Sequence, residues 1–485
     1  MEAPVVSTVH GRVRGLSVSA DIWGYHGIPY AAPPVGPLRW RPPQPAAGWT
    51  GIREGVAFGP DPIQPPGART SRAPGMAEDC LYLNVWAPKE HRAGGWPVLI
   101  WSCGGAFTTG GGAFAEEDPA RLAAKGAVVV SFNVRLNIFG FLAHPALSAE
   151  SPQGSSGNYG LMDQAAAFRW IRENIEAFNG DSRRMTFFGE SAGATMALLL
   201  LASPLLDRPY DRAIFQSPGS FGDLLPLAAA EEHGAALGGS VEEMRAIPAD
   251  ELLDRLKRLP AVRPSLWLAR PIRPIADGWL IRSTMPFAED FDAVPAIIGV
   301  NEDEGAFFGP RMGVRTLDDY RAFVSGIFGE NSEEALAYYP ATDEGQVGAM
   351  FAAVYGDRGF LYPIDRLARA FVRQGADVHR YVYAYRHGET RRPPTHSDEI
   401  GVLMDRLPHV RPQDADMADI LARSWIAFAE TGDPNCHGLP DWPRYDPATD
   451  RYLRLDVPPS VGAGWRADAI DFVARKSVDR SVSGR

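Results

Sequence analysis

The second hundred residues of the chain alternate between short strand-like runs and helical patterns, and this alternation constrains the fold more than any other feature. The runs at 97–101, 127–132 and 184–188 are β-branched or apolar and have the length of buried strands. Apolar residues from Leu161 to Phe178 recur at spacings of three and four, which predicts an amphipathic helix. Strands that alternate with helices form parallel sheets covered by helices on both faces. We therefore predict an α/β fold with a mostly parallel central sheet.

The rest of the sequence predicts further strands but indicates no domain boundary. No repeat with a period of about 20–50 residues and no low-complexity linker is present. Glycine-punctuated β-rich pieces at 5–30 predict antiparallel hairpins, and further strands are predicted at 81–86, 293–300 and 380–385. We expect one domain over residues 1–474 with helical insertions at about 220–290 and 310–375, and then a disordered tail over 475–485.

Composition argues against several kinds of partner. The 485 residues include 59 Asp and Glu against 48 Lys and Arg, a net charge of −11, which argues against binding to nucleic acid or an anionic membrane. No apolar run reaches the roughly 18 residues that span a bilayer. Three cysteines (Cys80, Cys103, Cys436) are too few for a disulfide framework, and no CxxC or HxxxH pair indicates a metal site. Residues 1–20 lack the features of a signal peptide, so we expect a cytoplasmic protein; the sequence indicates no oligomeric state.

The segment Gly189-Glu190-Ser191-Ala192-Gly193 is the first chemical signal. It lies between the strand at 185–188 and a helix of small and apolar residues. Such a strand-to-helix turn lifts a serine hydroxyl above the carboxyl edge of a sheet, and its glycines avoid clashes in the sharp turn. The following helix directs partial positive charge toward a developing oxyanion. We predict that Ser191 is a nucleophile; the alternative is a structural serine in a tight turn.

A serine nucleophile needs a base and an orienting acid, which follow it in the order acid, then histidine in this architecture. Three carboxylates, Glu302, Asp303 and Glu304, follow the strand at 293–300, and their spacing does not choose among them. His387 and His396 both follow the strand at 380–385. The rigid approach through Pro394 and Thr395 favours His396 over His387 as the base.

A glycine-rich loop follows the strand at 97–101, with Cys103-Gly104-Gly105-Ala106-Phe107 and then Gly110-Gly111-Gly112. A phosphate-binding loop is the competing interpretation. It fails because no GK[ST] follows and no intact G-x-G-x-x-G opens a helix here. Small residues that let backbone N–H groups approach a substrate carbonyl fit the loop better, so we predict an oxyanion hole.

These motifs occur with several others in one order along the chain. The others are Gly27-Ile28-Pro29-Tyr30-Ala31, Glu78-Asp79-Cys80-Leu81-Tyr82-Leu83-Asn84, Asn158-Tyr159-Gly160-Leu161-Met162-Asp163-Gln164 and Thr431-Gly432-Asp433-Pro434-Asn435. With them, the chain resembles the type-B carboxylesterases, the bacterial p-nitrobenzyl-esterase and cholinesterase-like branch of the α/β-hydrolases, from about Gly11 to Tyr445. The segments 143–147 and 394–400 are similar to those of fumonisin-detoxifying bacterial esterases.

The resemblance implies a serine esterase that acts on a small-molecule ester without a metal or cofactor. Ser191 matches the family nucleophile, Glu304 the acid and His396 the base. The oxyanion donors fall on the backbone N–H groups of Gly105, Ala106 and Ala192. The resemblance also implies a helical cap formed by the insertions.

Two departures from the family pattern stand out. Cys103-Gly104-Gly105-Ala106 replaces the usual His-Gly-Gly-Gly or Tyr-Gly-Gly-Gly, so that the Ala106 methyl narrows the acyl side while its N–H is kept. Cys103 itself is expected to fill space rather than react. Pro62 stands where secreted relatives have the disulfide partner of Cys80, so Cys80 is expected to be a free thiol, in agreement with a cytoplasmic location.

The substrate is the least determined feature. Four aromatic residues are candidates for an apolar pocket, namely Phe107, Trp267, Phe307 and Phe308. Arg263, Arg270 and Arg273 could attract a carboxylated substrate, although a solvated basic face is the simpler interpretation. A non-catalytic cholinesterase-like binding module is a weaker alternative, because all three catalytic positions are filled. An amidase or lactonase on the same fold stays open.

Overall fold

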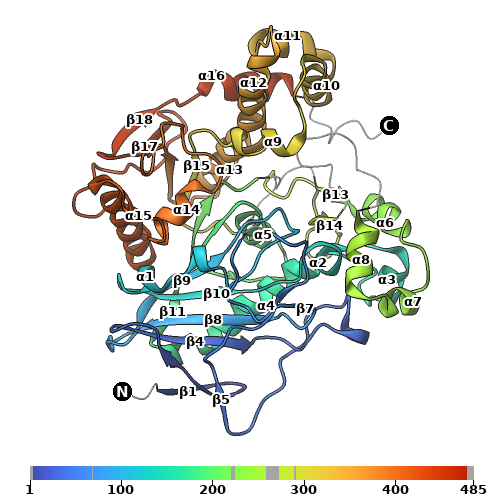
Figure 1. Ribbon diagram of the computed structural model, residues 1–485, viewed down its shortest axis with the longest axis vertical. Coiled ribbons are helices and arrows are strands. Elements are labelled where there is room, and N and C mark those ends of the chain that lie inside the picture. Colours follow the sequence, from blue (N-terminus) through green and yellow to red (C-terminus); the bar gives the residue numbers. More distant parts are fainter. Residues whose placement is uncertain (1–3, 68, 220–223, 258–271, 289–290, 478–485) are drawn as a thin grey trace.

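The computed structural model describes residues 4–67, 69–219, 224–257, 272–288 and 291–477. Its centre is a sheet of eleven strands in the order β18-β17-β16-β15-β12-β11-β9-β10-β8-β4-β3 (Figure 1). These strands are β3 Leu16–Ser17, β4 Ile22–Pro29, β8 Tyr82–Pro88, β9 Trp96–Ser102, β10 Val128–Phe132, β11 Gly180–Glu190, β12 Arg212–Gln216, β15 Ala296–Asn301, β16 Val378–Tyr383, β17 Arg451–Leu455 and β18 Ser460–Ala463.

The sheet is parallel in its middle and antiparallel at both edges. Strands β10, β9, β11, β12, β15, β16 and β17 pair in parallel with their neighbours. At one edge β8, β4 and β3 pair antiparallel, and at the other β18 pairs antiparallel with β17. The predicted α/β fold with a mostly parallel sheet is therefore confirmed, and so is the antiparallel N-terminal part.

Smaller sheets lie outside the central one. A three-stranded sheet contains β1 Val5–Thr8, β2 Gly11–Arg14 and β5 Ile52–Glu54. Two short pairs are β6 Asp61–Pro62 with β7 Met76–Ala77, and β13 Leu225–Pro226 with β14 Ile275–Ala276. Because β13 and β14 fall within the expected helical insertion at 220–290, that insertion is not wholly helical.

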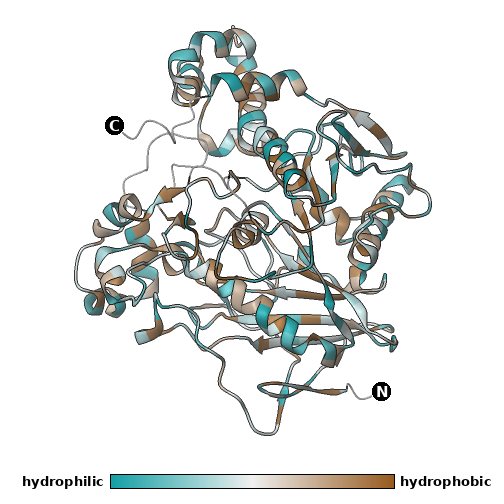
Figure 2. Ribbon diagram, turned by 180° about the vertical axis from the view of Figure 1, so that it is seen from behind, coloured by the Kyte–Doolittle hydropathy of each residue, from teal (hydrophilic) through white to brown (hydrophobic). Residues whose placement is uncertain are grey.

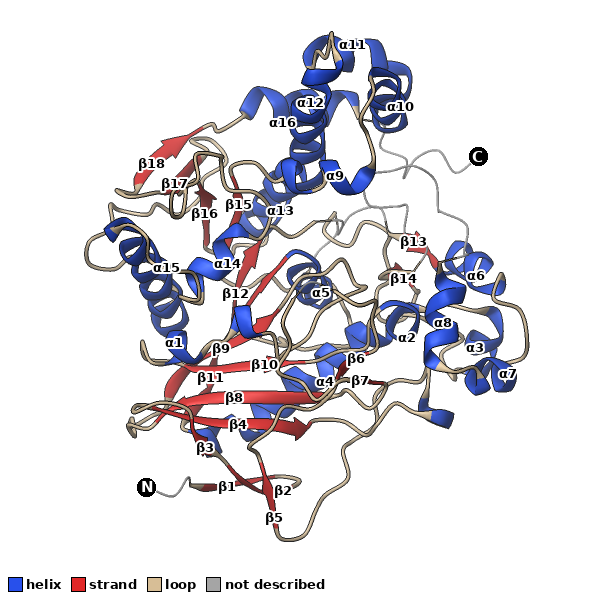
Figure 3. Ribbon diagram, viewed as in Figure 1, coloured by secondary structure: helices blue, strands red, loops and turns tan. Residues whose placement is uncertain are grey.

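Helices lie around the sheet (Figure 3). They are α1 Ala120–Ala123, α2 Asn137–Phe141, α3 Pro145–Glu150, α4 Tyr159–Asn174, α5 Ser191–Leu201, α6 Leu227–Ala235, α7 Val241–Ala246, α8 Ala249–Leu256, α9 Gly309–Met312, α10 Leu317–Phe328, α11 Ser332–Tyr338, α12 Glu344–Gly356, α13 Tyr362–Arg373, α14 Asp398–Leu403, α15 Pro412–Thr431 and α16 Ala467–Lys476. Eight of these helices gather in two separate groups: α6, α7 and α8 with α3, and α10, α11 and α12 with α16 (Figure 1). Helix α16 continues to Lys476, so residues 475 and 476 are helical and not part of the expected tail. Its apolar residues Ile470, Phe472 and Val473 bury against the core.

Strand β9 shows how the sheet separates two apolar cores. Val98 and Ile100 point to one face and pack in a cluster that contains α4 and α5. Leu99 and Trp101 point to the other face, in a cluster that contains α15. All four side chains are at most 1% exposed, as expected for a parallel strand covered on both sides. Brown, apolar residues accordingly gather along the strands in Figure 2, while the outer helices carry teal residues as well.

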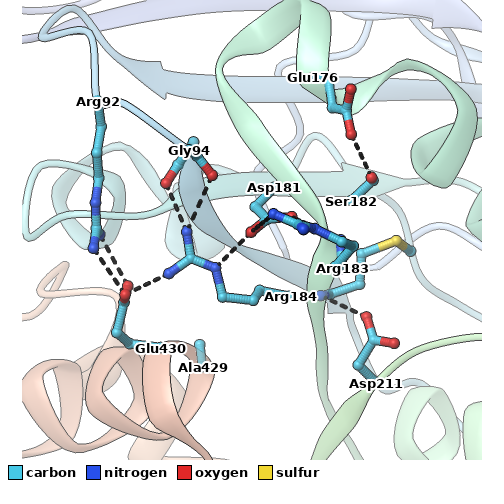
Figure 4. Close-up of polar contacts among 12 residues, drawn as sticks. Arg92, Gly94, Glu176, Asp181, Ser182, Arg183, Arg184, Asp211, Ala429 and Glu430 are labelled. Carbon is cyan, nitrogen blue, oxygen red and sulfur yellow. Dashed lines mark hydrogen bonds and ion pairs between the residues drawn. The ribbon is translucent and has the colours of Figure 1, made fainter.

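A charged network fixes the start of β11 to the end of α15 (Figure 4). The Arg184 guanidinium donates to Asp181 at 2.9 Å, to the Gly95 carbonyl at 2.7 Å and to Glu430. Arg92 forms a bidentate pair with the same Glu430 at 2.8 and 2.9 Å. Since β11 leads directly to Ser191, this network anchors the far end of the strand that carries the serine.

A buried ion pair connects the loop after β10 to α4. The Arg135 guanidinium donates to both carboxylate oxygens of Asp163, at 2.8 and 2.6 Å, and the Arg135 backbone N–H donates to the same carboxylate at 3.0 Å. The side chains are 3% and 0% exposed. Neither charge is solvated by bulk water, so each depends on the other.

We therefore expect Asp163→Ala to destabilise the protein strongly. It leaves the Arg135 guanidinium buried without a counter-charge, which typically costs about 3–5 kcal/mol. The urea midpoint, followed by circular dichroism, should fall clearly. Arg321→Ala is the control, because it removes a pair whose side chains are 59% and 93% exposed, and its midpoint should equal that of the unmodified protein. Equal midpoints for the two variants would contradict the prediction.

Candidate active site

Ser191 lies where β11 ends and α5 begins, in a left-handed conformation with φ of 52°. A side chain at Gly193 would place its Cβ 2.5 Å from the Cys103 carbonyl oxygen, and one at Gly189 would lie 2.8 Å from the Ser102 carbonyl oxygen. The glycines of the motif are thus required because the backbone after β9 crosses directly against the turn. The strain of the serine is held by this packing.

The structure brings Ser191, Glu304 and His396 together from three parts of the chain. His396 Nε2 is 2.9 Å from Ser191 Oγ, and His396 Nδ1 is 2.6 Å from Glu304 Oε2. The three residues are at most 9% exposed. Ser191 follows β11, Glu304 follows β15 and His396 lies in the loop after β16, so all three occupy the carboxyl edge of parallel strands.

Of the three carboxylates after β15, the structure brings only Glu304 to the imidazole. Glu304 Oε1 also accepts from the Asn301 backbone N–H at 2.7 Å and from the Ser217 hydroxyl. Glu302 instead pairs with Arg386 and Arg454. Both oxygens of the Glu304 carboxylate are therefore held, which fixes how it faces His396.

His387, the other histidine considered, lies elsewhere. Its Nε2 is 2.9 Å from the Pro408 carbonyl oxygen and its Nδ1 is 3.6 Å from Asp414. Asp414 accepts from the backbone N–H groups of Gly388, Val410 and Arg411, so this cluster ties two loops to the start of α15. His387 belongs to that structural cluster.

Sequence reasoning missed two buried glutamates beside the triad. Glu190, the residue before Ser191, places Oε1 3.0 Å from His396 Nε2 and accepts from the Ser397 hydroxyl at 2.5 Å. Glu399, which is fully buried, accepts from Asn301 at 2.5 Å and from Gln216 at 3.2 Å. Glu190 directly precedes Ser191, and Glu399 lies three residues after His396. The available sequence signal was therefore a glutamate close to each of these two residues.

These carboxylates control the charge of the site. Burial by itself lowers the pKa of His396, but Glu190 and Glu304 outweigh it, and the pKa of His396 is raised. Burial, together with the negative charges of Glu190 and Glu304, raises the pKa of Glu399 to about 8. At neutral pH Glu399 is therefore mainly an uncharged carboxylic acid, whereas Glu190 and Glu304 raise the pKa of the imidazole that they contact.

The glycine-rich loop after β9 lies over the serine. A side chain at Gly104 would overlap the Glu190 carboxylate and would lie 2.8 Å from Ser191 Cβ. Gly105 and Ala106, with φ of 137° and 53°, follow at once, and Ala192 occupies the first turn of α5. Gly104 thus lies against Ser191, Gly105 and Ala106 are the next two residues of the loop, and Ala192 directly follows the serine.

The predicted pocket aromatics fall into different places. The rings of Phe307 and Phe308 lie 5.5 and 5.1 Å from the His396 ring, which Phe360 also contacts at 4.7 Å. Phe107 is 8% exposed and packs against Phe141 in the core. Arg273 is buried as well, and not part of a solvated basic face. Trp267, Arg263 and Arg270 lie outside the described residues.

Other expectations concern cysteines, metals and membranes. Cys80 is a free, buried thiol, and it lines a small cavity together with Pro62. Within the described ranges, no group of three or more His, Cys, Asp or Glu side chains is arranged to hold a metal ion. In the same part of the chain, every helix is too short or too polar to cross a bilayer.

A mostly parallel sheet with a serine at a strand-to-helix turn, and with Glu304 and His396 at the same edge, is the architecture of an α/β-hydrolase. A family model described as the carboxylesterase family matches residues 2–473, and the chain belongs to that family.

Three curated relatives agree with this assignment. The chain is 42% identical to a fumonisin B1 esterase of Sphingopyxis macrogoltabida, over 90% of this chain and 84% of that protein. It is 31% identical to a para-nitrobenzyl esterase of Bacillus subtilis, over 94% and 95% of the two chains. It is 30% identical to a liver carboxylesterase of Sus scrofa, over 97% and 92%. The protein is thus a carboxylic-ester hydrolase of the type-B carboxylesterases, in the branch of the fumonisin esterase.

The pKa of His396 provides a test of the site's electrostatics. Glu190→Gln removes one of the two anions that raise it, so the imidazole should titrate at lower pH, by about 1 to 3 pH units. The measurement is the ring-nitrogen NMR titration of ¹⁵N-histidine-labelled protein. Glu302→Gln is the matched control: this carboxylate also follows β15 but pairs with Arg386 and Arg454 instead of His396, so its replacement should shift the titration less. The opposite ranking of the two variants would contradict this account.

Proposed function

We propose that the protein hydrolyses carboxylic esters through an acyl-enzyme, with Ser191 as nucleophile, His396 as general base and Glu304 as the orienting acid. The observation that carries the proposal is the continuous chain of short contacts from Ser191 Oγ through the imidazole to Glu304, at 2.9 and 2.6 Å. Nucleophile and base within hydrogen-bond reach, with the base held by a third group, are the geometric signature of an activated serine.

In the first step Ser191 Oγ attacks the ester carbonyl carbon while His396 Nε2 takes the hydroxyl proton. Glu304 holds the Nδ1–H tautomer and stabilises the imidazolium, a task to which the neighbouring Glu190 anion adds. The carbonyl oxygen becomes an oxyanion that the N–H groups of Gly105, Ala106 and Ala192 stabilise. Each such donor is typically worth about 10²–10³ in rate.

Collapse of the tetrahedral intermediate breaks the bond to the alcohol, which receives the proton from His396. Water then gives a proton to His396 and attacks the acyl-enzyme carbonyl. The second intermediate releases the carboxylic acid and returns the proton to Ser191 Oγ. The sequence needs only ester and water as reactants.

The residues around His396 and the names of the relatives guide the choice of ester substrates to assay. Phe307, Phe308 and Phe360 give the imidazole apolar surroundings, which suits an ester with an apolar part. Since the relative that is 42% identical is named for fumonisin B1, that compound is the first natural ester to assay. A synthetic panel that varies acyl size and acyl charge separately complements it, with matched amides and lactones included.

Ser191→Ala should abolish turnover of a short-chain p-nitrophenyl ester, because no other hydroxyl stands at His396 Nε2 in the described structure. We expect a loss of at least about 10³-fold. A fluorophosphonate probe should label the unmodified protein at Ser191, as shown by mass spectrometry of the modified peptide, and should leave the variant unlabelled. Labelling of a different residue in an active preparation would sink the assignment of the nucleophile.

The base is tested by a pair of histidine variants. His396→Ala should lose turnover to a similar extent, whereas His387→Ala should keep most of it, because the His387 ring contacts Pro408 and Asp414 instead of the serine. Turnover of both variants is compared with the same ester at several pH values. An inactive His387→Ala beside an active His396→Ala would reverse the roles.

A further inference from the structure

The ends of the oxyanion loop, residues 103–112, are held together by side chains that the proposed mechanism does not use. Cys103 Sγ accepts from the Gly111 backbone N–H at 3.1 Å and lies 3.4 Å from the Gly111 carbonyl oxygen, to which the thiol donates. One side chain therefore engages both backbone groups of one residue. It does so from the position immediately before Gly104, which crosses over Ser191.

Gln64 likewise binds both backbone groups of the preceding glycine, Gly110. Gln64 Oε1 accepts from the Gly110 N–H at 3.0 Å, and Gln64 Nε2 donates to the Gly110 carbonyl at 2.7 Å. Gly112 follows this pattern, with its N–H donating to Asn133 at 2.7 Å and its carbonyl accepting from the Ser131 hydroxyl at 2.7 Å. Three consecutive glycines thus have both backbone groups bound by side chains.

The spacing around this run explains why it consists of glycines. A Cβ on Gly111 would lie 2.7 Å from an Asp61 carboxylate oxygen, and one on Gly112 would lie 3.0 Å from the Ser131 hydroxyl. Gly110 has φ of 149°, and a Cβ there would lie 3.2 Å from Cys103 Sγ. The run is a close-packed backbone segment against which the start of the loop rests.

The loop between the two ends is closed on itself. The Gly105 carbonyl accepts from the N–H groups of Thr108 and Thr109, both at 3.0 Å, and from their hydroxyls at 3.1 and 3.2 Å. Because a trans peptide points its carbonyl and its N–H in opposite directions, these bonds set the direction of the Ala106 N–H. The remaining freedom of the loop is a movement of the whole turn, which the contacts of Cys103 and Gln64 to the glycine run restrain.

We propose that Cys103 and Gln64 are positioning residues for the reaction: they fix the glycine run against the start of the oxyanion loop and thereby set the place of the Gly105 and Ala106 N–H groups above Ser191. The inference rests on the proposed acyl-enzyme function. Cys103 serves as a neutral thiol that both donates and accepts, in agreement with burial, which raises its pKa. Its role is therefore hydrogen bonding within the loop, beyond filling space.

The test compares Cys103→Ala, Cys103→Ser and Gln64→Met. Alanine and methionine cannot make the two backbone contacts, whereas a serine hydroxyl can donate and accept as the thiol does. Since oxyanion donors act over a narrow range of distance, we expect kcat for a p-nitrophenyl ester to fall about 10-fold to 100-fold in Cys103→Ala and Gln64→Met, with KM within about 2-fold. Cys103→Ser should keep kcat within about 3-fold of the unmodified enzyme.

A second readout isolates the oxyanion. A trifluoromethyl ketone forms a tetrahedral adduct with a serine nucleophile, so its inhibition constant should weaken about as much as kcat falls in the alanine and methionine variants. Cys436→Ala is the control, because this half-buried cysteine contacts Ser424 and lies outside the loop. It should change neither kcat nor inhibition. Melting temperatures are recorded for all variants.

Two results overturn the proposal: unchanged kcat and ketone inhibition in Cys103→Ala, or losses in Cys103→Ala that serine does not rescue and that follow the melting temperature alone. Failure of the proposed function is distinguishable from either. In that case the ketone and the fluorophosphonate do not modify Ser191 even in the unmodified protein, and the inference about the loop falls with it.

Discussion

The site depends on an imidazole that is buried between two carboxylates. His396 is 4% exposed and contacts Glu304 at Nδ1 and Glu190 at Nε2. A buried imidazolium without counter-charges is costly, and the two carboxylates lower that cost when His396 takes the Ser191 proton. The surrounding donors, Asn301 and Ser217 on Glu304 and Ser397 on Glu190, then leave little freedom to the carboxylates. The charge that ester attack creates on His396 is thereby stabilised by groups that are already in place.

The order of the parallel strands places the residues of the site at the carboxyl edge of the central sheet. Glu304, Ser217 and Ser191 follow three neighbouring strands, β15, β12 and β11, whose parallel pairing fixes their order. The close approach of the Cys103–Gly104 segment to the Ser191 turn is possible because Gly104 and Gly193 have no side chains. The antiparallel edges lie outside this region, so they can vary in length without moving the reacting atoms. Helix α12, in contrast, packs directly against the segment that follows Glu304.

Sequence reasoning succeeded where the signal is local and failed where it is not. The strand–turn–helix around Ser191 and the amphipathic pattern of α4 are each contained in about twenty residues, and both predicted elements are present. The choice among Glu302, Asp303 and Glu304 depends on the pairing of β15 with β16, which spacing does not encode; only the family resemblance selected Glu304. Strands β12, β17 and β18 were not foreseen, because runs of four or five residues at 212–216, 451–455 and 460–463 show little alternation of their own.

The two missed glutamates show a different limit. Glu190 occupies a motif position defined only by its neighbours, and Glu399 reads as an ordinary charged residue at a helix start. Their meaning comes from burial, since a fully buried carboxyl must either find a cation or remain protonated. Glu190 lies 3.0 Å from His396 Nε2, where it faces the charge that forms on the imidazole, whereas Glu399 has a raised pKa and is bonded to the amides of Asn301 and Gln216. One buried carboxylate therefore adds to the charge that stabilises the imidazolium, while the other adds hydrogen bonds without adding charge. This division lets an acidic cluster surround a histidine that must still give up its proton.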